Sequence, residues 1–227
     1  MRDWYKEIGF KNNPFSIKPN NNLFGVENKI KKIIKLIKAG ESCFISGDYG
    51  SGKTTALKKI INEYAGENKL MYVNFDSNAK SVNFKKLLIG RSNLFKRLIK
   101  IKAKEAILLA DEVQDMTLKD AKQIKNYREK GNIDSIIFVG IKLPKELIDF
   151  VGENHFEFKG LDNNSAIKLT KSRIGESRII SDEKIKLINK KSNNPRDFLK
   201  NLEDIFRFAI DSGNKYISKE HIRKVLG

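Results

Sequence analysis

The chain of 227 residues carries 45 Lys and Arg against 28 Asp and Glu, a formal charge of +17, and 40% of its residues are hydrophobic. This length and apolar content are typical of one large or two small folded domains, which excludes a wholly disordered chain. The single cysteine, Cys43, excludes a disulfide framework, and His155 and His221 lie too far apart in sequence for a zinc site of the familiar spacings.

The sequence has neither an apolar run near the roughly 20 residues that cross a bilayer nor the apolar N-terminal stretch of a signal peptide. A cytoplasmic protein with no membrane partner is therefore expected. A strongly basic chain is typical of proteins that bind a polyanion. A coding bias toward Lys, Ile and Asn would give the same charge, so composition alone leaves both explanations open.

Taken in chain order, residues 1–26 have no long periodicity, because proline, glycine and asparagine interrupt it, and their aromatic residues predict an ordered N-terminal arm. A helical stripe of isoleucines begins at Glu27 and ends at Gly40. Beyond it, strands are predicted at 42–46, 70–75, 106–110 and 135–139, with a weaker one at 155–158 and a helix at 54–64. Near-continuous apolar strands separated by helical segments predict an α/β fold whose parallel sheet is covered on both faces.

From Asn163 the pattern becomes entirely helical. Helices are predicted at 165–174, at 182–191, from Pro195 and after Ser218. Ser181, Asn194 and Ser218 are the expected N-caps. The change of pattern predicts a domain boundary near residue 160.

A glycine-rich turn lies between a predicted strand and a predicted helix. It fits the P-loop pattern G-x-x-x-x-G-K-[ST] in the context that this motif requires, with the residues Gly47, Asp48, Tyr49, Gly50, Ser51, Gly52, Lys53, Thr54 and Thr55. Glycines allow successive backbone N–H groups to point into one anion-sized hollow at a helix N-terminus. Lys53 is predicted to reach the β- and γ-phosphates of ATP, and Thr54 to bind Mg²⁺.

Two acids follow the predicted strand at 106–110. The Mg²⁺ bound by Thr54 needs a carboxylate on its other side, and Asp111 is predicted to supply it, directly or through water. Glu112, one residue further, is placed to polarise an attacking water. A simple strand-end turn would also explain the acidic pair, but together with the P-loop it predicts an enzyme that hydrolyses ATP.

With these motifs in place, the sequence resembles the AAA+ ATPases over nearly its whole length. The segment Phe10-Lys11-Asn12-Asn13-Pro14-Phe15, followed by Leu23-Phe24-Gly25, is similar to the start of the archaeal origin-recognition initiators and of the ExeA-type and TnsC/TniB-type ATPases. The P-loop and the Asp111-Glu112 pair match both groups. The segments at 161–166 and 173–175 look like the start of their helical lid.

The resemblance implies a P-loop NTPase fold of the AAA+ type, a three-layer parallel sheet with a small helical lid. The implied division is an arm at 1–26, a nucleotide-binding domain at 27–160 and a lid at 161–227. Asn194-Pro195-Arg196-Asp197 resembles the sensor 2 motif, which implies that Arg196 reaches the γ-phosphate and converts its loss into a domain rotation. An ordinary surface arginine in a first helical turn would show the same pattern.

Two residues that the resemblance leads one to expect are missing. The sensor 1 position is normally polar, but here the strand runs into Gly140-Ile141-Lys142, so either Lys142 substitutes or the role is absent. No arginine finger lies between Leu147 and Phe158; His155, Asn154, the upstream Lys145 or a partner protein could replace it. A trans arginine contributes on the order of 10³ to 10⁵ in rate, so slow hydrolysis by the unassembled chain is expected.

The stretch from Asp76 to Glu105 holds nine Lys and Arg against two acids. In rings and filaments of such ATPases this region faces the central channel, so the resemblance implies contacts with DNA phosphates that do not depend on sequence. The alternative is a solvated face on ordinary helices. The candidate residues are Lys85, Lys86, Arg91, Lys96, Arg97 and Lys100.

Because the sequence ends at Gly227, directly after the expected lid, no winged-helix DNA-binding domain is expected. The leading hypothesis is therefore an ATPase that binds ATP and Mg²⁺ between subunits and couples hydrolysis to homo-oligomerisation on DNA, as an initiator, loader or transposition regulator. One alternative is an ExeA-like secretion or assembly ATPase. The other is an ATP-gated adaptor that hydrolyses little.

Overall fold

The computed structural model describes residues 3–17, 23–64, 69–75 and 106–227. The chain divides into two compact units. One, called the helical unit below, comprises Met1–Glu27, Tyr49–Thr55 and Lys159–Gly227; the other, the sheet unit, comprises Asn28–Asp48 and Ala56–Phe158. The chain thus passes from the sheet unit to the helical unit within the glycine-rich turn and returns in the helix that follows it.

The sheet unit is built on five parallel strands in the order β2-β3-β4-β1-β5. Their bounds are β1 Cys43–Ser46, β2 Leu70–Asn74, β3 Ala106–Asp111, β4 Ile133–Gly140 and β5 His155–Glu157. The predicted parallel sheet is confirmed, including its weak fifth strand. Strand β4 is longer than predicted at both ends and reaches Gly140, because its edge residues pair with β1 and β3.

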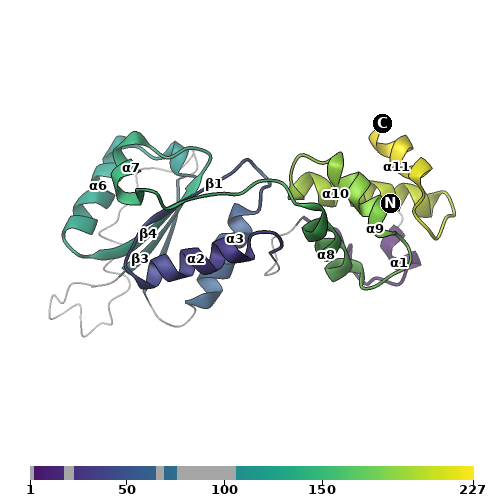
Figure 1. Ribbon diagram of the computed structural model, residues 1–227, viewed down its shortest axis with the longest axis horizontal. Helices are drawn as coiled ribbons and strands as arrows, with labels where there is room; N and C mark the ends of the chain where they lie inside the picture. Colours follow the sequence, from purple (N-terminus) through teal and green to yellow (C-terminus); the bar gives the residue numbers. More distant parts are fainter. Residues whose placement is uncertain (1–2, 18–22, 65–68, 76–105) are drawn as a thin grey trace. The chain divides into compact units, whose positions relative to one another are not determined.

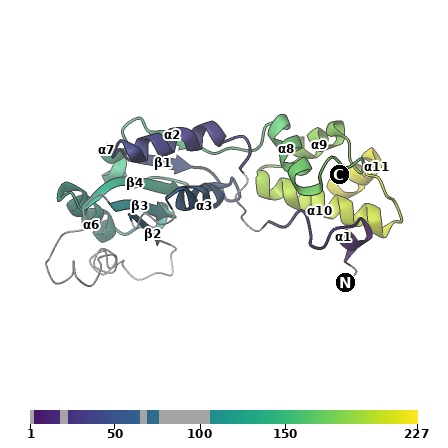
Figure 2. The same ribbon diagram turned by 90° about the horizontal axis from the view of Figure 1, so that it is seen from below.

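Helices cover both faces of this sheet. In Figures 1 and 2, α2 and the body of α3 lie on one face, and α6 and α7 lie on the other. Their bounds are α2 Glu27–Lys38, α3 Lys53–Glu63, α6 Leu118–Glu129 and α7 Ile148–Val151, with short 3₁₀ turns η1 Val113–Asp115 and η2 Lys145–Leu147. Helix α6 was not assigned from the sequence. Thr117 caps it by accepting a hydrogen bond from the N–H of Asp120 at 3.2 Å.

The core explains why the strands read as unbroken apolar runs. All six residues of β3 are buried. On one face, residues such as Leu108, Ile136 and Phe138 pack with Ile124 of α6 in a single apolar cluster. Burial also raises the pKa of the Cys43 thiol to about 12, so this thiol stays neutral in β1.

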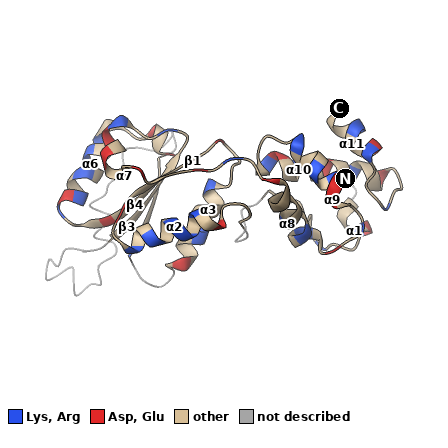
Figure 3. Ribbon diagram, in the orientation of Figure 1, with Lys and Arg blue, Asp and Glu red and all other residues tan. Residues whose placement is uncertain are grey.

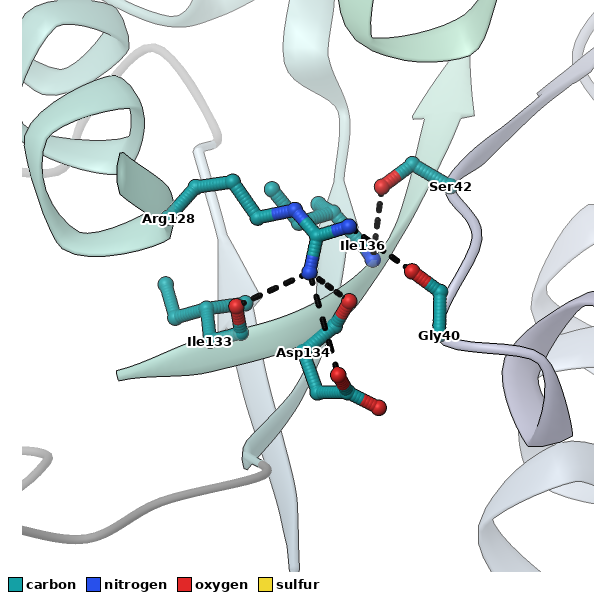
Figure 4. Close-up of polar contacts among 6 residues, drawn as sticks. All are labelled: Gly40, Ser42, Arg128, Ile133, Asp134 and Ile136. Atoms are coloured by element: carbon teal, nitrogen blue, oxygen red, sulfur yellow. Dashed lines mark hydrogen bonds and ion pairs between the residues drawn. The ribbon is translucent and has the colours of Figure 1, made fainter. Parts of the chain in front are cut away.

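Arg128, in the last turn of α6, holds three segments of the sheet unit together (Figure 4). Its guanidinium donates hydrogen bonds to the backbone carbonyls of Ile133, at 3.1 Å, and Asp134 at the start of β4. It also donates to the carbonyl of Gly40, at 2.7 Å, in the turn after α2. One planar cation thus binds carbonyls of two segments and ties the start of β4 to the turn after α2.

The helical unit contains α1 Trp4–Glu7, α8 Asn163–Ile174, α9 Asp182–Lys190, α10 Pro195–Asp211 and α11 Lys219–Leu226. Asn194 and Ser218 cap α10 and α11 through their side chains, as predicted, whereas the side chain of Ser181 makes no such bond at α9. Helix α8 begins two residues before the predicted start. The reason is that Asp162 caps it by accepting a hydrogen bond from the N–H of Ser165 at 2.9 Å.

The N-terminal arm contributes to the core of this unit. Trp4 and Phe15 are buried, and the ring centroid of Phe15 lies 4.7 Å from that of Phe206 on α10. The arm is also tied by Arg173 of α8, which donates hydrogen bonds to the carbonyls of Pro14 and Ser16. Burial lowers the pKa of this guanidinium. The aromatic residues noted in the sequence are therefore structural anchors.

Candidate functional site

The glycine-rich turn, called the phosphate loop below, connects β1 to the N-terminus of α3. Two of its glycines have left-handed backbone angles, Gly50 with φ +84° and Gly52 with φ +98°. Nothing lies within 4 Å of a Cβ built on Gly52, so its backbone angle alone favours glycine there. Such angles turn successive N–H groups to one side, which is the geometry that binds phosphates.

The side chains of the phosphate loop support the same interpretation. The ammonium of Lys53 is buried, and its Nζ lies 5.8 Å from the ring centroid of Tyr49. The buried hydroxyl of Ser51 has no hydrogen-bond partner among the described residues. Burying a polar hydroxyl without a partner is costly, and the N-terminus of a helix favours an anion beside it. The loop therefore fits a phosphate group.

The turn before α10 lies against the phosphate loop inside the helical unit. A Cβ at Gly50 would stand 2.7 Å from Oδ1 of Asn194 and 2.8 Å from Cβ of Arg196. The same Oδ1 accepts the N–H of Asp197 at 2.9 Å, which fixes the turn. Arg196 itself is exposed. The structure thus brings Arg196 next to the phosphate loop; its action as sensor 2 remains a prediction.

In the sheet unit, Asp111 ends β3 with 4% of its surface exposed. Its Oδ2 accepts a hydrogen bond from the hydroxyl of Tyr72 on β2 at 3.0 Å, and its Oδ1 accepts the N–H of Glu112 at 3.0 Å. Burial and the charge of Asp111 raise the pKa of Tyr72. A carboxylate oxygen has two lone pairs, so the oriented Asp111 can still bind a hard cation such as Mg²⁺.

Glu112 has a strained backbone. Among the described residues it is the one non-glycine position with a positive φ, at φ 52° and ψ 45°. This conformation costs an L-residue roughly 1 to 2 kcal/mol. Its carboxylate Oε2 accepts a hydrogen bond of 2.7 Å from Nε2 of Gln114. Strain at a carboxylate whose position is also fixed by a hydrogen bond is typical of a functional site.

At the end of β4, the space beside Gly140 is filled from another segment. A Cβ at Gly140 would stand 2.5 Å from Oε1 of Gln114, and the next N–H, that of Ile141, donates to this oxygen at 3.1 Å. Lys142 is exposed. Sequence analysis missed Gln114; the signal was a polar residue two positions after Glu112, together with a glycine where a polar residue is usual.

Two of the candidates for the missing arginine finger have contacts with β1 or the residues just before it. Asn154 donates through Nδ2 to Oε2 of Glu41 at 3.0 Å and to the carbonyl of Ser42 at 3.2 Å. Nε2 of His155 is hydrogen-bonded to Oγ of Ser46 at 2.6 Å, and its ring stacks on Phe44. These contacts hold both side chains within their own sheet. Lys145, on η2, is exposed.

The six predicted DNA-contacting residues, Lys85, Lys86, Arg91, Lys96, Arg97 and Lys100, lie outside the described residues. In the described part of the chain, Lys and Arg residues are spread over several helices (Figure 3). Helix α2, for example, exposes four lysines: Lys31, Lys32, Lys35 and Lys38. No helix among the described residues is long and apolar enough to cross a membrane.

Part of the chain matches a known family model. Residues 40–143, which include the phosphate loop, the β3 tip and Gly140, match a family model described as an AAA domain. No curated protein gives a significant sequence match.

Solved structures are similar over nearly the whole chain. A chain of Drosophila ORC bound to DNA matches with a TM-score of 0.72 and 16% identity, covering 94% of this chain and 63% of that one. The Aeropyrum pernix Orc1 protein in complex with DNA gives 0.65 and 13%, covering 93% and 68%. A Thermotoga maritima RuvB variant gives 0.68 and 15%, covering 92% and 72%.

The present chain spans just under two thirds of the length of the Drosophila chain. At these identities the similarity shows the fold. It agrees with the five-stranded parallel sheet and its flanking helices, and with the family model over residues 40–143. Residues 40–143 thus match an AAA domain model, and the chain shares its fold with the ORC, Orc1 and RuvB structures.

Proposed function

We propose that the protein is an ATPase that binds ATP and Mg²⁺ between subunits and couples binding and hydrolysis to assembly on DNA. The observation that carries this proposal is the phosphate loop. Its left-handed glycines, the buried Lys53 and the buried hydroxyl of Ser51, which has no hydrogen-bond partner in the described part of the chain, support an anion-binding turn at the start of α3.

Each residue of the candidate site has a distinct role in this proposal. The backbone N–H groups from Gly47 to Gly52 and the ammonium of Lys53 bind the phosphates. Thr54 and Asp111 would hold Mg²⁺, which supplies charge neutralisation at the β- and γ-phosphates. Glu112 orients and polarises the attacking water. Arg196, next to Gly50, responds to the γ-phosphate.

The ATPase part of the proposal is tested by two substitutions. Lys53→Ala is expected to abolish measurable ATP binding or weaken it about a hundredfold, because it removes a charge-assisted bond to phosphate. Glu112→Gln is expected to retain ATP affinity while kcat falls by about 10² to 10⁴. ATP affinity is measured with a fluorescent nucleotide and hydrolysis by phosphate release.

The matched control is Glu129→Gln, an exposed glutamate on α6, which should behave as the wild type. A Glu112→Gln chain that hydrolyses ATP at the wild-type rate would contradict the role of Glu112. A wild-type chain that binds no nucleotide would contradict the whole proposal.

The DNA part of the proposal is supported by the charge of +17 and by the basic stretch from Asp76 to Glu105. The Drosophila and Aeropyrum structures with the same fold contain DNA. Binding without sequence readout depends on phosphate contacts, so affinity should fall steeply between low and physiological salt. Size measurements with and without ATP and DNA test whether the two ligands drive assembly.

Neutralising Lys96, Arg97 and Lys100 together should weaken binding to all DNA sequences alike. Neutralising Lys31, Lys32 and Lys35, which are exposed on α2, is the matched control for a general loss of charge. Equal weakening by both triple variants would contradict a dedicated surface in the Asp76–Glu105 stretch. Absence of DNA binding at low salt would contradict the DNA part altogether.

Slow hydrolysis by the unassembled chain is also part of the proposal. The segment from Leu147 to Phe158 contains no arginine, and the two nearest polar candidates are held by β1 and the residues before it. An arginine or equivalent group from a partner should raise the rate by on the order of 10³ or more. Rapid turnover by the dilute monomer would contradict this expectation.

The same contacts of Asn154 and His155 favour a second candidate, an ATP-gated adaptor that hydrolyses little. In that case Glu112→Gln should leave the ATP-dependent change in size and its lifetime unaltered. In an active ATPase the same substitution should trap the ATP-bound assembly, because hydrolysis no longer causes the assembly to dissociate.

A further inference from the structure

Gln114 joins the loop after β3 to the end of β4. Its Oε1 accepts the N–H of Ile141 at 3.1 Å, and its Nε2 donates to Oε2 of Glu112 at 2.7 Å. A longer contact of 3.3 Å runs from Nε2 to Asp115. The orientation of the amide follows from chemistry, because a backbone N–H can only donate and a carboxylate can only accept.

The glycine at the end of β4 is a consequence of this arrangement. A Cβ on Gly140 would come within 2.5 Å of Oε1 of Gln114, and within 3.1 Å of Cγ2 of Val113. The backbone of Gly140 does not have a positive φ, so no conformational reason requires glycine at this position. The side chain of Gln114 therefore occupies the volume that a residue at position 140 would otherwise fill.

Gln114 is also held firmly relative to Glu112. The 3₁₀ turn Val113–Asp115 begins directly after Glu112, and the N–H of Asp115 donates to the carbonyl of Glu112 at 3.0 Å. Val113 is fully buried, which anchors this turn in the sheet core. Gln114 cannot shift along the chain without breaking the turn, so its two hydrogen bonds tie Glu112 to β4.

We propose that Gln114 is a positioning residue for ATP hydrolysis, which fixes the carboxylate of Glu112 against the end of β4. The inference rests on the ATPase activity proposed above. One carboxylate oxygen of Glu112 is occupied by the amide of Gln114, so the other is directed to the attacking water. This link between two strand ends holds the carboxylate of Glu112 in one geometry. Losing that geometry should lower the rate by up to about 10²-fold.

Substitution of Gln114 separates positioning from packing. Gln114→Met keeps the length and volume of the side chain but removes both hydrogen bonds. Gln114→Glu keeps an acceptor for Ile141 but replaces the donor to Glu112 by a second carboxylate. Both are expected to lower kcat by about tenfold to a hundredfold with unchanged ATP affinity and KM. Gln123→Met, at a partly exposed glutamine of α6, is the matched control.

Gly140→Ala gives an independent test. The nearest obstructing atom is the end of a flexible side chain, whereas Cγ2 and the backbone nitrogen of Val113 stand further away at 3.1 and 3.3 Å. An added Cβ should therefore displace Gln114 and reproduce the loss of kcat. In a Gln114→Ala background the same substitution should add little, because its effect has already occurred. Additive losses in the double variant would overturn the inference, as would a wild-type kcat in Gln114→Met.

Hydrogen exchange at the Ile141 amide distinguishes failure of this inference from failure of the proposed function. Protection should be lost in Gln114→Met and retained in Gln114→Glu. If the wild-type chain hydrolyses no ATP under any condition, the proposed function and the catalytic role of Gln114 fall together, while exchange still reports whether the contact exists. If the wild type hydrolyses ATP and Gln114→Met does so equally well, the inference alone is overturned.

Discussion

Gly50 in the phosphate loop and Gly140 at the end of β4 both lack room for a side chain, but for different reasons. Gly50 has φ +84°, and an added Cβ would stand 2.8 Å from Cβ of Arg196, an atom next to the backbone. Gly140 lacks a positive φ, and the nearest obstruction is the terminal oxygen of Gln114 at 2.5 Å. The first constraint comes from the backbone and its close packing, and the second comes mainly from one movable side chain, with Val113 at 3.1 Å as a further close neighbour.

The two sites therefore depend on different parts of the sequence. The phosphate loop is made by consecutive residues whose main chain does the binding, so a short motif describes it almost completely. The β3 tip gathers Tyr72, Asp111, Glu112, Gln114 and Gly140 from three strands, so its side chains depend on one another. Substitutions in the phosphate loop should directly change the binding of ATP. Substitutions at the β3 tip should act through the hydrogen bonds that link its side chains.

Gly50→Ala should have the largest effect. A non-glycine residue at this positive φ costs about 1 to 2 kcal/mol, and crowding against Arg196 and Asn194 adds about 1 to 3 kcal/mol. ATP affinity and thermal stability should both fall. Gly213→Ala is the matched control, since Gly213 has φ +76° with nothing within 4 Å of its added Cβ. Equal effects of the two substitutions would show that the contact with Arg196 is unimportant.

Arg128→Met should have the next largest effect and acts at the opposite end of β4 from Gly140. It removes a charged donor from the carbonyls of Gly40, Ile133 and Asp134, at a cost of about 2 kcal/mol in the free energy of unfolding. Urea denaturation measures this loss. Lys125→Met, at an exposed position of the same helix, should change stability little. An unchanged urea midpoint for Arg128→Met would mean that the hydrogen bonds of Arg128 are not needed to position β4.

Tyr72→Phe tests whether the β3 tip behaves as a network. The substitution removes the hydrogen bond of 3.0 Å to Oδ2 of Asp111, worth about 1 kcal/mol at a half-exposed side chain. The Mg²⁺ concentration that gives half-maximal ATP hydrolysis should rise about fivefold, with ATP affinity in the absence of Mg²⁺ unchanged. Tyr216→Phe, at an exposed tyrosine of the helical unit, should show no change.

The smallest expected effect is the contribution of Asp162 to the pH dependence of folding stability. Hydrogen bonds from the hydroxyl and N–H of Ser165 lower the pKa of Asp162 below its ordinary value of 3.8. A lowered pKa in the folded state means that the stabilisation is present above the ordinary value and disappears as the pH falls through the lowered one. Because Asp162 is exposed, we expect only about 0.5 kcal/mol.

Asp162→Asn retains the N-cap oxygen but has no charge to titrate. Its stability should lie slightly below that of the wild type at pH 7, and the difference should shrink as the pH falls below the ordinary value of 3.8 and vanish below the lowered pKa. Chemical denaturation at several pH values makes this comparison. A difference that persists in acid would show that the charge of Asp162 is not its source.

Much of the fold followed from local patterns in the sequence. Unbroken apolar runs predicted four buried strands; β1, β3 and β4 are buried, whereas burial alternates along the edge strand β2. The capping residues Asn194 and Ser218 predicted where α10 and α11 begin. Helix α6 was missed because most of its residues are polar and only Ala121 and Ile124 of its apolar residues are buried in the core. The strand β5 has only three residues, so its sequence carries little signal of its own, and its pairing with β1 identifies it as a strand.

The sequence by itself determined the phosphate loop and the acidic pair, because consecutive residues carry both motifs. Only the tertiary structure decided that Gln114 fills the space beside Gly140, that Tyr72 orients Asp111, and that Arg196 begins its helix against Gly50. Each of these contacts joins residues more than 25 positions apart. Sequence spacing carries no information about such distances until strand order and helix packing are fixed.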